Sequence, residues 1–345
     1  MTADRDRRRA TIHDVARHAG VSITTVSHSL NTKGIVAAAT RQRVLDAAAA
    51  LGYSPNPIAR RLRGNRLGVI GLVIRPLDSL ETYQPEGVDY FVRFVGAAAV
   101  ESLDRGFGLM LVRDPTKQNA PAIALGVDGF IVCDPVGNDP VIELLDRSDI
   151  PLVTVGRDIE RPNFENWLES GGVTDATVVF EHLSAQGAKR IALVTGTDDN
   201  AWYADSMQAY AEWILAHPQD AIVYHQDETT GETGGRVVAD AMLADARGLP
   251  DAVYFLTGRG AAGLQARFQE RGLEIPRDLL IVAGSDAEQT RSAVPTITSV
   301  DLAPEETARA AVDFLLRRLD DENAVAPPPV QNTLRVRGST TRPSA

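Results

Sequence analysis

Short polar side chains gather near the start of the chain, where they would suit contact with a nucleic acid. A helix is expected to begin after Ser22. Its outer face would carry Ile23, Thr24, Ser27 and His28, together with Thr25 near its start. Side chains of this length reach base edges and phosphates when a helix lies in a major groove. A structural surface helix more often carries Lys and Glu, so this face favours DNA binding.

A second pattern would suit nucleotide chemistry. Gly258, Gly260 and Gly263 have G-x-G-x-x-G spacing after an expected strand ending at Leu256, and Asp286 ends the next strand. This spacing occurs in dinucleotide-binding turns, but no catalytic acid, base or hydride acceptor can be assembled around it. The milder interpretation is that a helix N-terminus, helped by Arg259, contacts an anionic effector.

Other catalytic or metal-binding patterns do not occur. The six His lack H-E-x-x-H spacing, and the chain contains no G-x-S-x-G elbow. The single cysteine, Cys133, lies in the apolar run 129–133, which indicates a buried core thiol rather than a nucleophile. We therefore expect a protein that is not an enzyme and that uses no cofactor and no metal.

Three short helices are expected to position the polar face. The hydroxyl of Thr11 can cap a first helix, and the carboxylate of Asp14 follows three residues later, as in a capping box. That helix would end at Gly20. Ser22 can cap the second, which packs through Val26 and Leu30 at four-residue spacing. The third would run from about Ala38 to Leu51. Its inward residues would be Val44, Leu45 and Ala48. Two short helices joined by so tight a turn indicate a helix-turn-helix.

A fourth, shorter helix is expected between this unit and the rest of the chain. Asn56 is a suitable N-cap for this helix, and Pro57 suits its first helical position. Gly64 suits the position that follows the C-terminal end of the helix. About two turns are marginal in isolation, so the stability of this segment must come from a partner.

The charge is distributed unevenly along the chain. Residues 1–66 contain 12 Lys and Arg against 4 Asp and Glu, a net charge of +8. The remaining residues contain 23 basic and 42 acidic side chains, a net of −19, within a total of 345 residues and −11. A basic head on an acidic body is typical of a polyanion-binding module joined to a regulatory or catalytic domain.

The residues from Thr11 to Gly64 resemble the headpiece of the lac repressor (LacI/GalR) family of transcription regulators. The segments that carry the resemblance are Thr11-Ile12-x-Asp14-Val15-Ala16, Ala19-Gly20-Val21-Ser22, Thr25-Val26-Ser27, Leu30-Asn31, Thr40-Arg41 to Val44, Leu51-Gly52-Tyr53, Pro55-Asn56 and Ala59-Arg60-x-Leu62. So many matching positions make this far more specific than a lone helix-turn-helix pattern.

The resemblance implies roles for individual residues in binding DNA. Residues that match backbone-positioning sites are Ser22, Thr25, Asn31, Tyr53 and Asn56, while Ile23, Thr24 and His28 occupy base-reading positions and Ser27 and Ala59 complete the interface. The short helix would be a hinge helix that pairs across a dimer and wedges Leu62 into the minor groove. His28 stands where the family usually has Arg, and it cannot make the bidentate pair with guanine, so the operator sequence cannot be transferred from relatives.

The body is expected to be an α/β core of two doubly wound parallel-sheet lobes, similar to periplasmic binding proteins. Strands are predicted at 67–74, 108–112, 129–133, 152–155, 190–195, 221–225, 252–256, 279–283, 297–300 and 333–336, with helices such as 92–104, 141–147, 174–186 and 304–319. The predicted domains are a basic disordered tail at 1–10, the helix-turn-helix domain at 11–53, the hinge helix and linker at 54–66, and an effector-binding and dimerisation domain at 67–341. Its first lobe would comprise about 67–157 and 289–319, and its second about 158–288 and 320–341.

Most positions that grip a sugar in the family are altered in this chain. Gly171-Gly172 replaces an Asp-Asn pair, Ser206 replaces an Arg, Thr257-Gly258 replaces an Asn-Asp pair, and only Asp286 of a paired-aspartate site remains. Sugar pockets need such bidentate polar groups, so an ordinary hexose is disfavoured. The candidate effector contacts are Asp78, Asp134, Arg157, Trp202, Ser206, Arg259 and Asp286.

These observations predict a cytoplasmic, sequence-specific DNA-binding repressor with no membrane association. Its partners would be a pseudo-palindromic double-stranded operator, a second copy of the chain, and a small-molecule effector such as a sugar derivative or an anion. A tetramer is disfavoured because acidic residues and Pro327-Pro328-Pro329 follow Leu319 where apolar heptads would be needed. The alternatives are a regulator whose body is only a dimerisation scaffold and, less favoured, a nucleotide-dependent enzyme using Gly258, Gly260 and Gly263.

Overall fold

The computed structural model describes residues 10–30, 36–53, 66–75, 89–118, 123–169 and 171–341. These form two compact units, one ending at Leu67 and one beginning at Gly68. The predicted roles of Asn31, Asn56, Ala59, Leu62 and Asp78, the tail at 1–9 and the hinge segment from 54 to 65 lie outside the described residues.

The first unit contains three helices around a small core. They are α1 (Ile12–Ala19), α2 (Ile23–Leu30) and α3 (Ala38–Ala50). Thr11 and Asp14 form a reciprocal capping box at α1, and Gly20 ends that helix in the left-handed region at φ 64°. The buried side chains are Val15, Ala16, Val26, Val44, Ala47 and Ala48.

One inward residue of α3 was predicted wrongly. Val44 is 0% exposed as expected, but the neighbouring Leu45 is 42% exposed, and Ala47 is buried instead. Adjacent residues lie about 100° apart around a helix, so the contacts with α1 and α2 decide which of the two turns inward.

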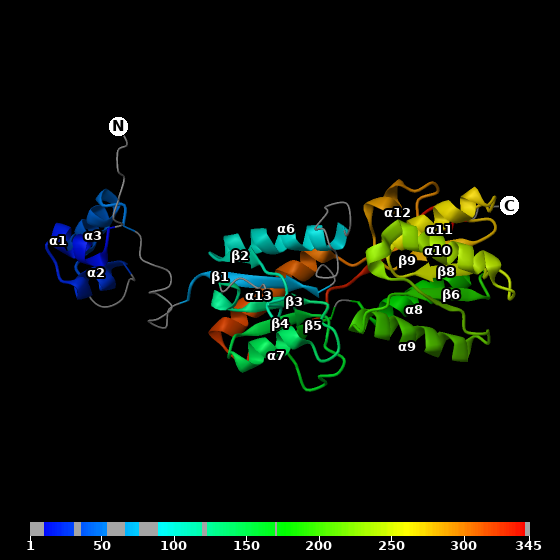
Figure 1. Ribbon diagram of the computed structural model, residues 1–345, viewed down its shortest axis with the longest axis horizontal. Helices are drawn as coiled ribbons and strands as arrows, with labels where there is room; N and C mark the ends of the chain where they lie inside the picture. The colour runs from blue at the N-terminus through cyan, green and yellow to red at the C-terminus, as the bar shows by residue number, and fades with distance from the viewer. Residues whose placement is uncertain are drawn as a thin grey trace. The chain divides into compact units, whose positions relative to one another are not determined.

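The second unit contains a first lobe built on a parallel five-stranded sheet of order β2-β1-β3-β4-β5 (Figure 1). Its strands are β1 (Val69–Ile74), β2 (Gly108–Leu111), β3 (Phe130–Cys133), β4 (Leu152–Val155) and β5 (Trp167–Leu168). α6 (Asp89–Asp104) and α13 (Pro304–Asp320) cover one face, whereas α7 (Pro140–Arg147) and the short η1 (Ala124–Gly126) cover the other. Cys133 is buried in this core, as predicted.

The second lobe has a six-stranded sheet of order β11-β10-β9-β8-β6-β7. The strands are β6 (Ile191–Thr195), β7 (Val223–His225), β8 (Ala252–Phe255), β9 (Leu280–Ala283), β10 (Thr298–Asp301) and β11 (Thr333–Arg335), the last antiparallel to β10. α8 (Val173–Ala185) and α9 (Ala201–Ala216) pack on one face. α10 (Gly231–Ala244) and α11 (Gly258–Glu270) pack on the other, with η2 (Glu228–Thr230) before α10 and α12 (Glu288–Ser292) beside α11 (Figure 1).

Two of the expected lobe boundaries differ from the structure. β5 pairs with β4 through Thr154 and Trp167, so the first lobe continues past residue 157. β10 pairs with β9, so residues 289–301 belong to the second lobe and the chain returns to the first only at α13. A buried strand pattern does not identify the sheet that the strand joins, and β5 is too short to produce a pattern.

None of the helices in the described ranges is long and apolar enough to cross a membrane.

Candidate nucleic-acid interface and ligand pocket

The exposed face of α2 carries the residues predicted to read bases. Ile23, Thr24 and His28 are exposed, whereas Val26 and Ser29 face the core. The hydroxyl of Ser29 donates to the carbonyl of Thr25 at 2.8 Å and so is used within the helix. The three base-reading candidates therefore lie together on one solvent-facing surface.

The backbone-positioning candidates at the start of α2 are held by local hydrogen bonds. The backbone N–H of Thr25 donates to Ser22 Oγ at 3.1 Å, and the two hydroxyls lie 2.9 Å apart. Ser22 thus caps α2, because it accepts one of the N–H groups that are free at the start of the helix. Ser27 is half-buried, and Tyr53 packs partly against the core of this unit.

A pocket in the second unit lies between the two lobes, where α6 of the first lobe meets the carboxyl ends of second-lobe strands. It is lined by Asp89, Tyr90, Glu228, Thr257, Gly258, Arg259, Ser285, Asp286 and Ala287. Loops at the carboxyl ends of parallel strands are the usual place for ligands in α/β sheets. Two predicted contacts, Arg259 and Asp286, share this pocket.

Asp286 is held by protein groups on several sides. Its carboxylate accepts hydrogen bonds from Arg337 at 2.7 Å, Ser299 at 2.7 Å, Thr290 at 2.8 Å and Arg291 at 3.0 Å. Burial by itself would raise the pKa of Asp286, but these donors outweigh burial and hold the pKa well below its usual range. The residue is thus first a structural centre that joins β10, α12 and the chain after β11.

The other candidates occupy different surroundings. Arg157 forms a bidentate ion pair with Asp205 of α9, with Nη1 and Oδ2 at 2.7 Å. Trp202 stacks on Tyr203 with ring centroids 5.3 Å apart and packs against the core, and Ser206 is buried on the same helix. Asp134 follows β3 and interacts electrostatically with Glu228.

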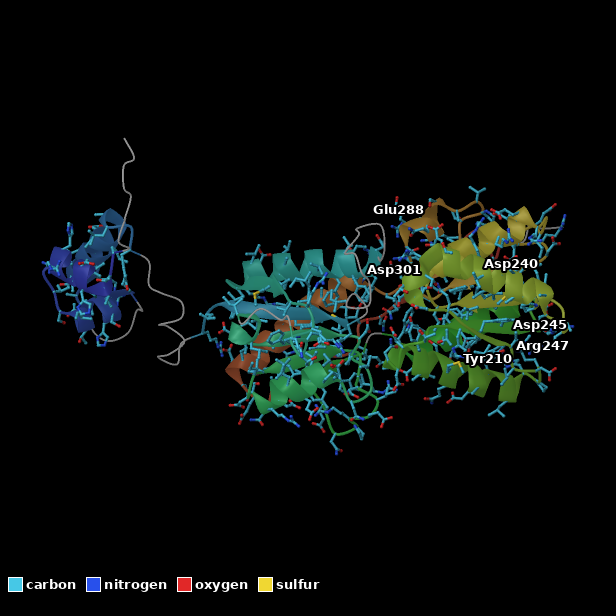
Figure 2. The ribbon with its side chains drawn as sticks, in the orientation of Figure 1. Tyr210, Asp240, Asp245, Arg247, Glu288 and Asp301 are labelled. Carbon is cyan, nitrogen blue, oxygen red and sulfur yellow. The ribbon has the colours of Figure 1, made fainter. Side chains whose placement is uncertain are left out.

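Contacts between the lobes include both charged and backbone groups. Besides Arg157–Asp205, Arg291 of the second lobe lies 3.1 Å from Asp89 at the start of α6. The backbone N–H of Gly137 donates to the carbonyl of Asp199 at 2.9 Å. Asp245 and Arg247, by contrast, form an exposed ion pair at the end of the second lobe away from the first (Figure 2).

Sequence reasoning missed three contributors to the pocket, namely Asp89, Tyr90 and Glu228. Glu228 follows the predicted strand 221–225, so its place at a strand's carboxyl end was a usable signal. Asp89 and Tyr90 begin a helix of the other lobe, and no local pattern links them to residues more than 130 positions later. Among the described residues, no three His, Cys, Asp or Glu side chains gather as a metal site.

The glycines of the G-x-G-x-x-G pattern serve helix packing. All three are buried within α11. A Cβ on Gly263 would lie 2.0 Å from the carbonyl oxygen of Glu232, and one on Gly235 would lie 2.0 Å from that of Gly260. Gly235 and Gly263 therefore let α10 and α11 approach closely. A Cβ on Gly258 would instead meet the carbonyl oxygen of Ser285, and one on Gly260 would meet the ring of Phe255, so close packing explains all three glycines of the pattern without a bound phosphate.

We expect Gly263→Ala to lower the free energy of unfolding of the body by about 1–3 kcal/mol, because the added methyl forces α10 and α11 apart. Chemical denaturation measures the loss. Ala241→Ser is the control, since this α10 side chain also gains one atom but is exposed to solvent. Equal stability of Gly263→Ala and the wild type would contradict the packing role.

Comparison with known proteins bears on both units. Residues 11–56 match the family described as bacterial regulatory proteins, lacI family, and residues 180–340 match the periplasmic binding protein-like domain. The HTH-type transcriptional repressor PurR of Vibrio atlanticus (strain LGP32) is 28% identical over 328 residues, covering 91% of this chain and 93% of the relative.

Solved structures share the fold. The lac repressor dimer bound to operator and the anti-inducer ONPF has a TM-score of 0.79 at 22% identity, covering 97% of this chain and 100% of that one. A complex of the transcriptional regulator CelR with cellobiose has a TM-score of 0.69 at 24% identity, covering 96% and 100%.

Proposed function

The chain belongs to the LacI/GalR family of transcriptional regulators, and we propose that it represses transcription as a homodimer on a pseudo-palindromic operator, under the control of a small molecule held between the lobes of its body. It is a DNA-binding repressor of that family and not an enzyme. Because its target is the chromosome, we place it in the cytoplasm.

The observation that carries the proposal is the exposed face of α2. Ile23, Thr24 and His28 point to solvent from a helix that is capped by Ser22 and anchored by Val26. This presentation leaves the side chains free to meet base edges in the major groove. The net charge of +8 over residues 1–66 supplies attraction to phosphates that does not depend on sequence.

We expect Thr24→Ala and His28→Ala to change which bases are preferred, with a loss of about 1–3 kcal/mol on the wild-type site. Each removes a group that contacts base edges in the proposed complex. Selection of bound duplexes from a randomised library, followed by titration on the wild-type site, measures both effects.

Arg17→Ala on α1 is the matched control, because this exposed arginine carries charge without belonging to the α2 face. It should weaken all sequences nearly equally, since phosphate contacts carry no base information. An unchanged selected motif for both α2 variants would contradict this placement of the reading surface.

We further propose that residues 57–63 form a hinge helix on DNA. Asn31 and Asn56 would contact the backbone, Ala59 would pack in the hinge, and Leu62 would wedge into the minor groove. So short a helix needs a partner for stability, which two copies meeting on the operator would provide.

An apolar row on α6 supports dimerisation. Val92, Val100 and Leu103 are 54%, 60% and 68% exposed at helical spacing, and Leu111 of the neighbouring edge strand β2 is also exposed. Burying such a row against a second copy removes apolar surface from water. Asp89 and Tyr90, at the start of α6, also line the pocket. A ligand bound there would therefore contact the same helix that carries the apolar row.

We expect Leu103→Asp to shift the protein toward the monomer, since each dimer would bring two new carboxylates into an apolar contact. Sedimentation velocity at several concentrations measures the shift. Leu215→Asp on α9, an even more exposed leucine outside the row, should leave the dimer intact. A stable species of four chains in the wild type, or a dimer insensitive to Leu103→Asp, would contradict this arrangement.

The effector proposal is supported by the pocket and by its departures from sugar-binding patterns. Ser206 is buried and Gly171 and Gly172 carry no side chains to bracket vicinal hydroxyls, so an ordinary hexose lacks the polar groups it needs. The alternative is a body that binds no ligand and serves only as a dimerisation scaffold. A ligand that binds only the folded state raises the melting temperature, so thermal-shift screening separates the two.

A further inference from the structure

One guanidinium group lines the pocket without a partner among the described residues. Arg259 lies in the first turn of α11, is half-buried and belongs to the pocket wall. No hydrogen bond or ion pair joins it to another described residue, whereas Arg291 beside the same pocket contacts two carboxylates. A guanidinium has five N–H donors and no acceptor, so only acceptor atoms from water or a ligand can satisfy Arg259.

The backbone at the start of α10 positions this guanidinium. A Cβ on Gly231 would lie 2.3 Å from Nη2 of Arg259, 2.7 Å from Cζ and 3.0 Å from Nε. The guanidinium therefore occupies the space that a side chain at residue 231 would fill, between the first turns of α10 and α11. Contact with fixed backbone limits the motion of the long side chain, so less entropy is lost when a ligand binds to it.

Two carboxylates at the pocket are neutralised by arginines of the protein. Asp89 lies 3.8 Å from Arg93 on α6 and 3.1 Å from Arg291 of the other lobe. Asp286 lies 3.0 Å from the same Arg291 and 2.7 Å from Arg337. Because each of these carboxylates already has two cations, neither requires a positively charged group from a ligand.

The third carboxylate of the pocket, that of Glu228, is bound by a hydroxyl rather than by Arg259. Tyr203 donates a hydrogen bond to Glu228 Oε2 at 2.8 Å. The ring of Tyr203 packs over Gly196, where a Cβ would lie 2.1 Å from its Cζ. Glu228 and Arg259 interact electrostatically, but no ion pair joins these two described residues. The N–H donors of Arg259 therefore remain available to a ligand.

Hydroxyl groups from both lobes add further donors to the pocket. Tyr90 at the start of α6 and Ser285 after β9 line it, and no described residue accepts a hydrogen bond from either hydroxyl. Ser285 Oγ accepts the backbone N–H of Gly258 at 3.1 Å, so the guanidinium rather than this end of α11 is the main donor. The carboxylates are engaged and the donors are not, so a complementary ligand must bring acceptor oxygen atoms.

We propose that the effector carries an anionic oxygen group, a carboxylate or a phosphate, that binds to the guanidinium of Arg259. This inference rests on the proposed function, because it takes the pocket to be the effector site. The planar guanidinium presents paired N–H groups that match two oxygen atoms of a carboxylate or a phosphate. A neutral polyol would leave the positive charge without a counterpart, and a cationic ligand would be repelled by it.

Matched sets of small molecules test the charge of the ligand directly. One set is glucose 6-phosphate, glucose and glucosamine, and the other is succinate, 1,4-butanediol and putrescine. Thermal shifts of the full-length protein are measured at neutral pH, with sodium chloride added to give every sample the same ionic strength. We expect an anion to raise the melting temperature more than its neutral and cationic partners do.

The two sources of the anionic group are separated in the same experiment by inorganic phosphate and acetate, each added alone. A response to glucose 6-phosphate and to inorganic phosphate identifies a phosphate group. A response to succinate and to acetate identifies a carboxylate.

Variants of two arginines locate the effect. Arg259→Gln removes the charge, so the dissociation constant of the anion, measured by calorimetric titration, should rise about tenfold to a hundredfold. Arg259→Lys keeps the charge without the paired donors and should lose less affinity. Arg236→Gln on α10 is the matched control, because it removes the same charge from a surface ion pair with Glu270 and should bind the anion as the wild type does.

The stability of the ligand-free protein separates binding from a structural role. No described residue pairs with Arg259, so Arg259→Gln should melt at nearly the same temperature as the wild type when no ligand is present. A large loss of stability in the absence of ligand would show that Arg259 supports the fold, and it would count against the inference.

The inference is also overturned if no anion stabilises the protein, if a neutral or cationic partner does so more strongly, or if Arg259→Gln binds the anion as tightly as the wild type. Operator binding is measured on the same preparations. Intact operator binding without a response to anions would overturn only the anionic effector, whereas a protein that selects no DNA sequence would overturn the proposed function itself.

Discussion

Replacing Val44 by Asp is expected to abolish operator binding while the body stays folded. Val44 is 0% exposed in a core of six buried residues, so the new carboxylate would be buried without a partner. Such burial costs several kcal/mol, which is comparable with the whole stability of so small a unit. Operator affinity falls with the fraction of heads that stay folded, so each cost of about 1.4 kcal/mol beyond the stability of the head lowers the affinity about tenfold.

Fluorescence anisotropy with a labelled operator and thermal melting of the full chain measure the two consequences. Leu45→Asp is the control, because the neighbouring side chain is 42% exposed and its replacement should leave operator affinity nearly unchanged. The body should melt at the same temperature in all three proteins, since it forms a separate compact unit from Gly68. Equal losses for the two variants would show that the described core of α3 is wrong.

Asp286→Ala is expected to lower the free energy of unfolding of the body by about 3–5 kcal/mol. The substitution leaves Arg337, whose side chain is only 19% exposed, without its carboxylate, and it also removes the acceptor for Ser299 and Thr290. Removing one partner of a buried ion pair costs this much because the remaining charge stays desolvated. Chemical denaturation at neutral pH measures the change.

The pH dependence of stability provides a second readout for Asp286. Its pKa is held below the usual value in the folded state, so its contribution is present above about pH 4 and is lost as the pH falls further. The Asp286→Ala variant should therefore lose less stability on acidification than the wild type. Asp240→Ala is the control, because Asp240 also contacts two arginines, Arg267 and Arg271, but on an exposed surface (Figure 2), and little change is expected. Equal effects of both variants would contradict the structural role of Asp286.

Local signals in the sequence were sufficient for the elements of the head. The box of Thr11 and Asp14, the stop at Gly20 and the cap at Ser22 each involve residues within four positions, and the structure has them where they were expected. The runs of apolar residues likewise predicted most strands of the body and the burial of Cys133. Capping and periodicity depend on near neighbours in the chain, so they can be read from the sequence alone.

The tertiary structure decided what depends on distant partners. Whether Val44 or Leu45 turns inward is set by contacts with other helices, and the sheet that β10 joins is set by its pairing with β9. The role of Gly263 in α11 could be interpreted correctly only with α10 packed against it. The pocket, too, required both lobes, because Tyr90 and Glu228 are neighbours only in space. Periodicity records which side of an element is buried, but it does not record what the element is buried against.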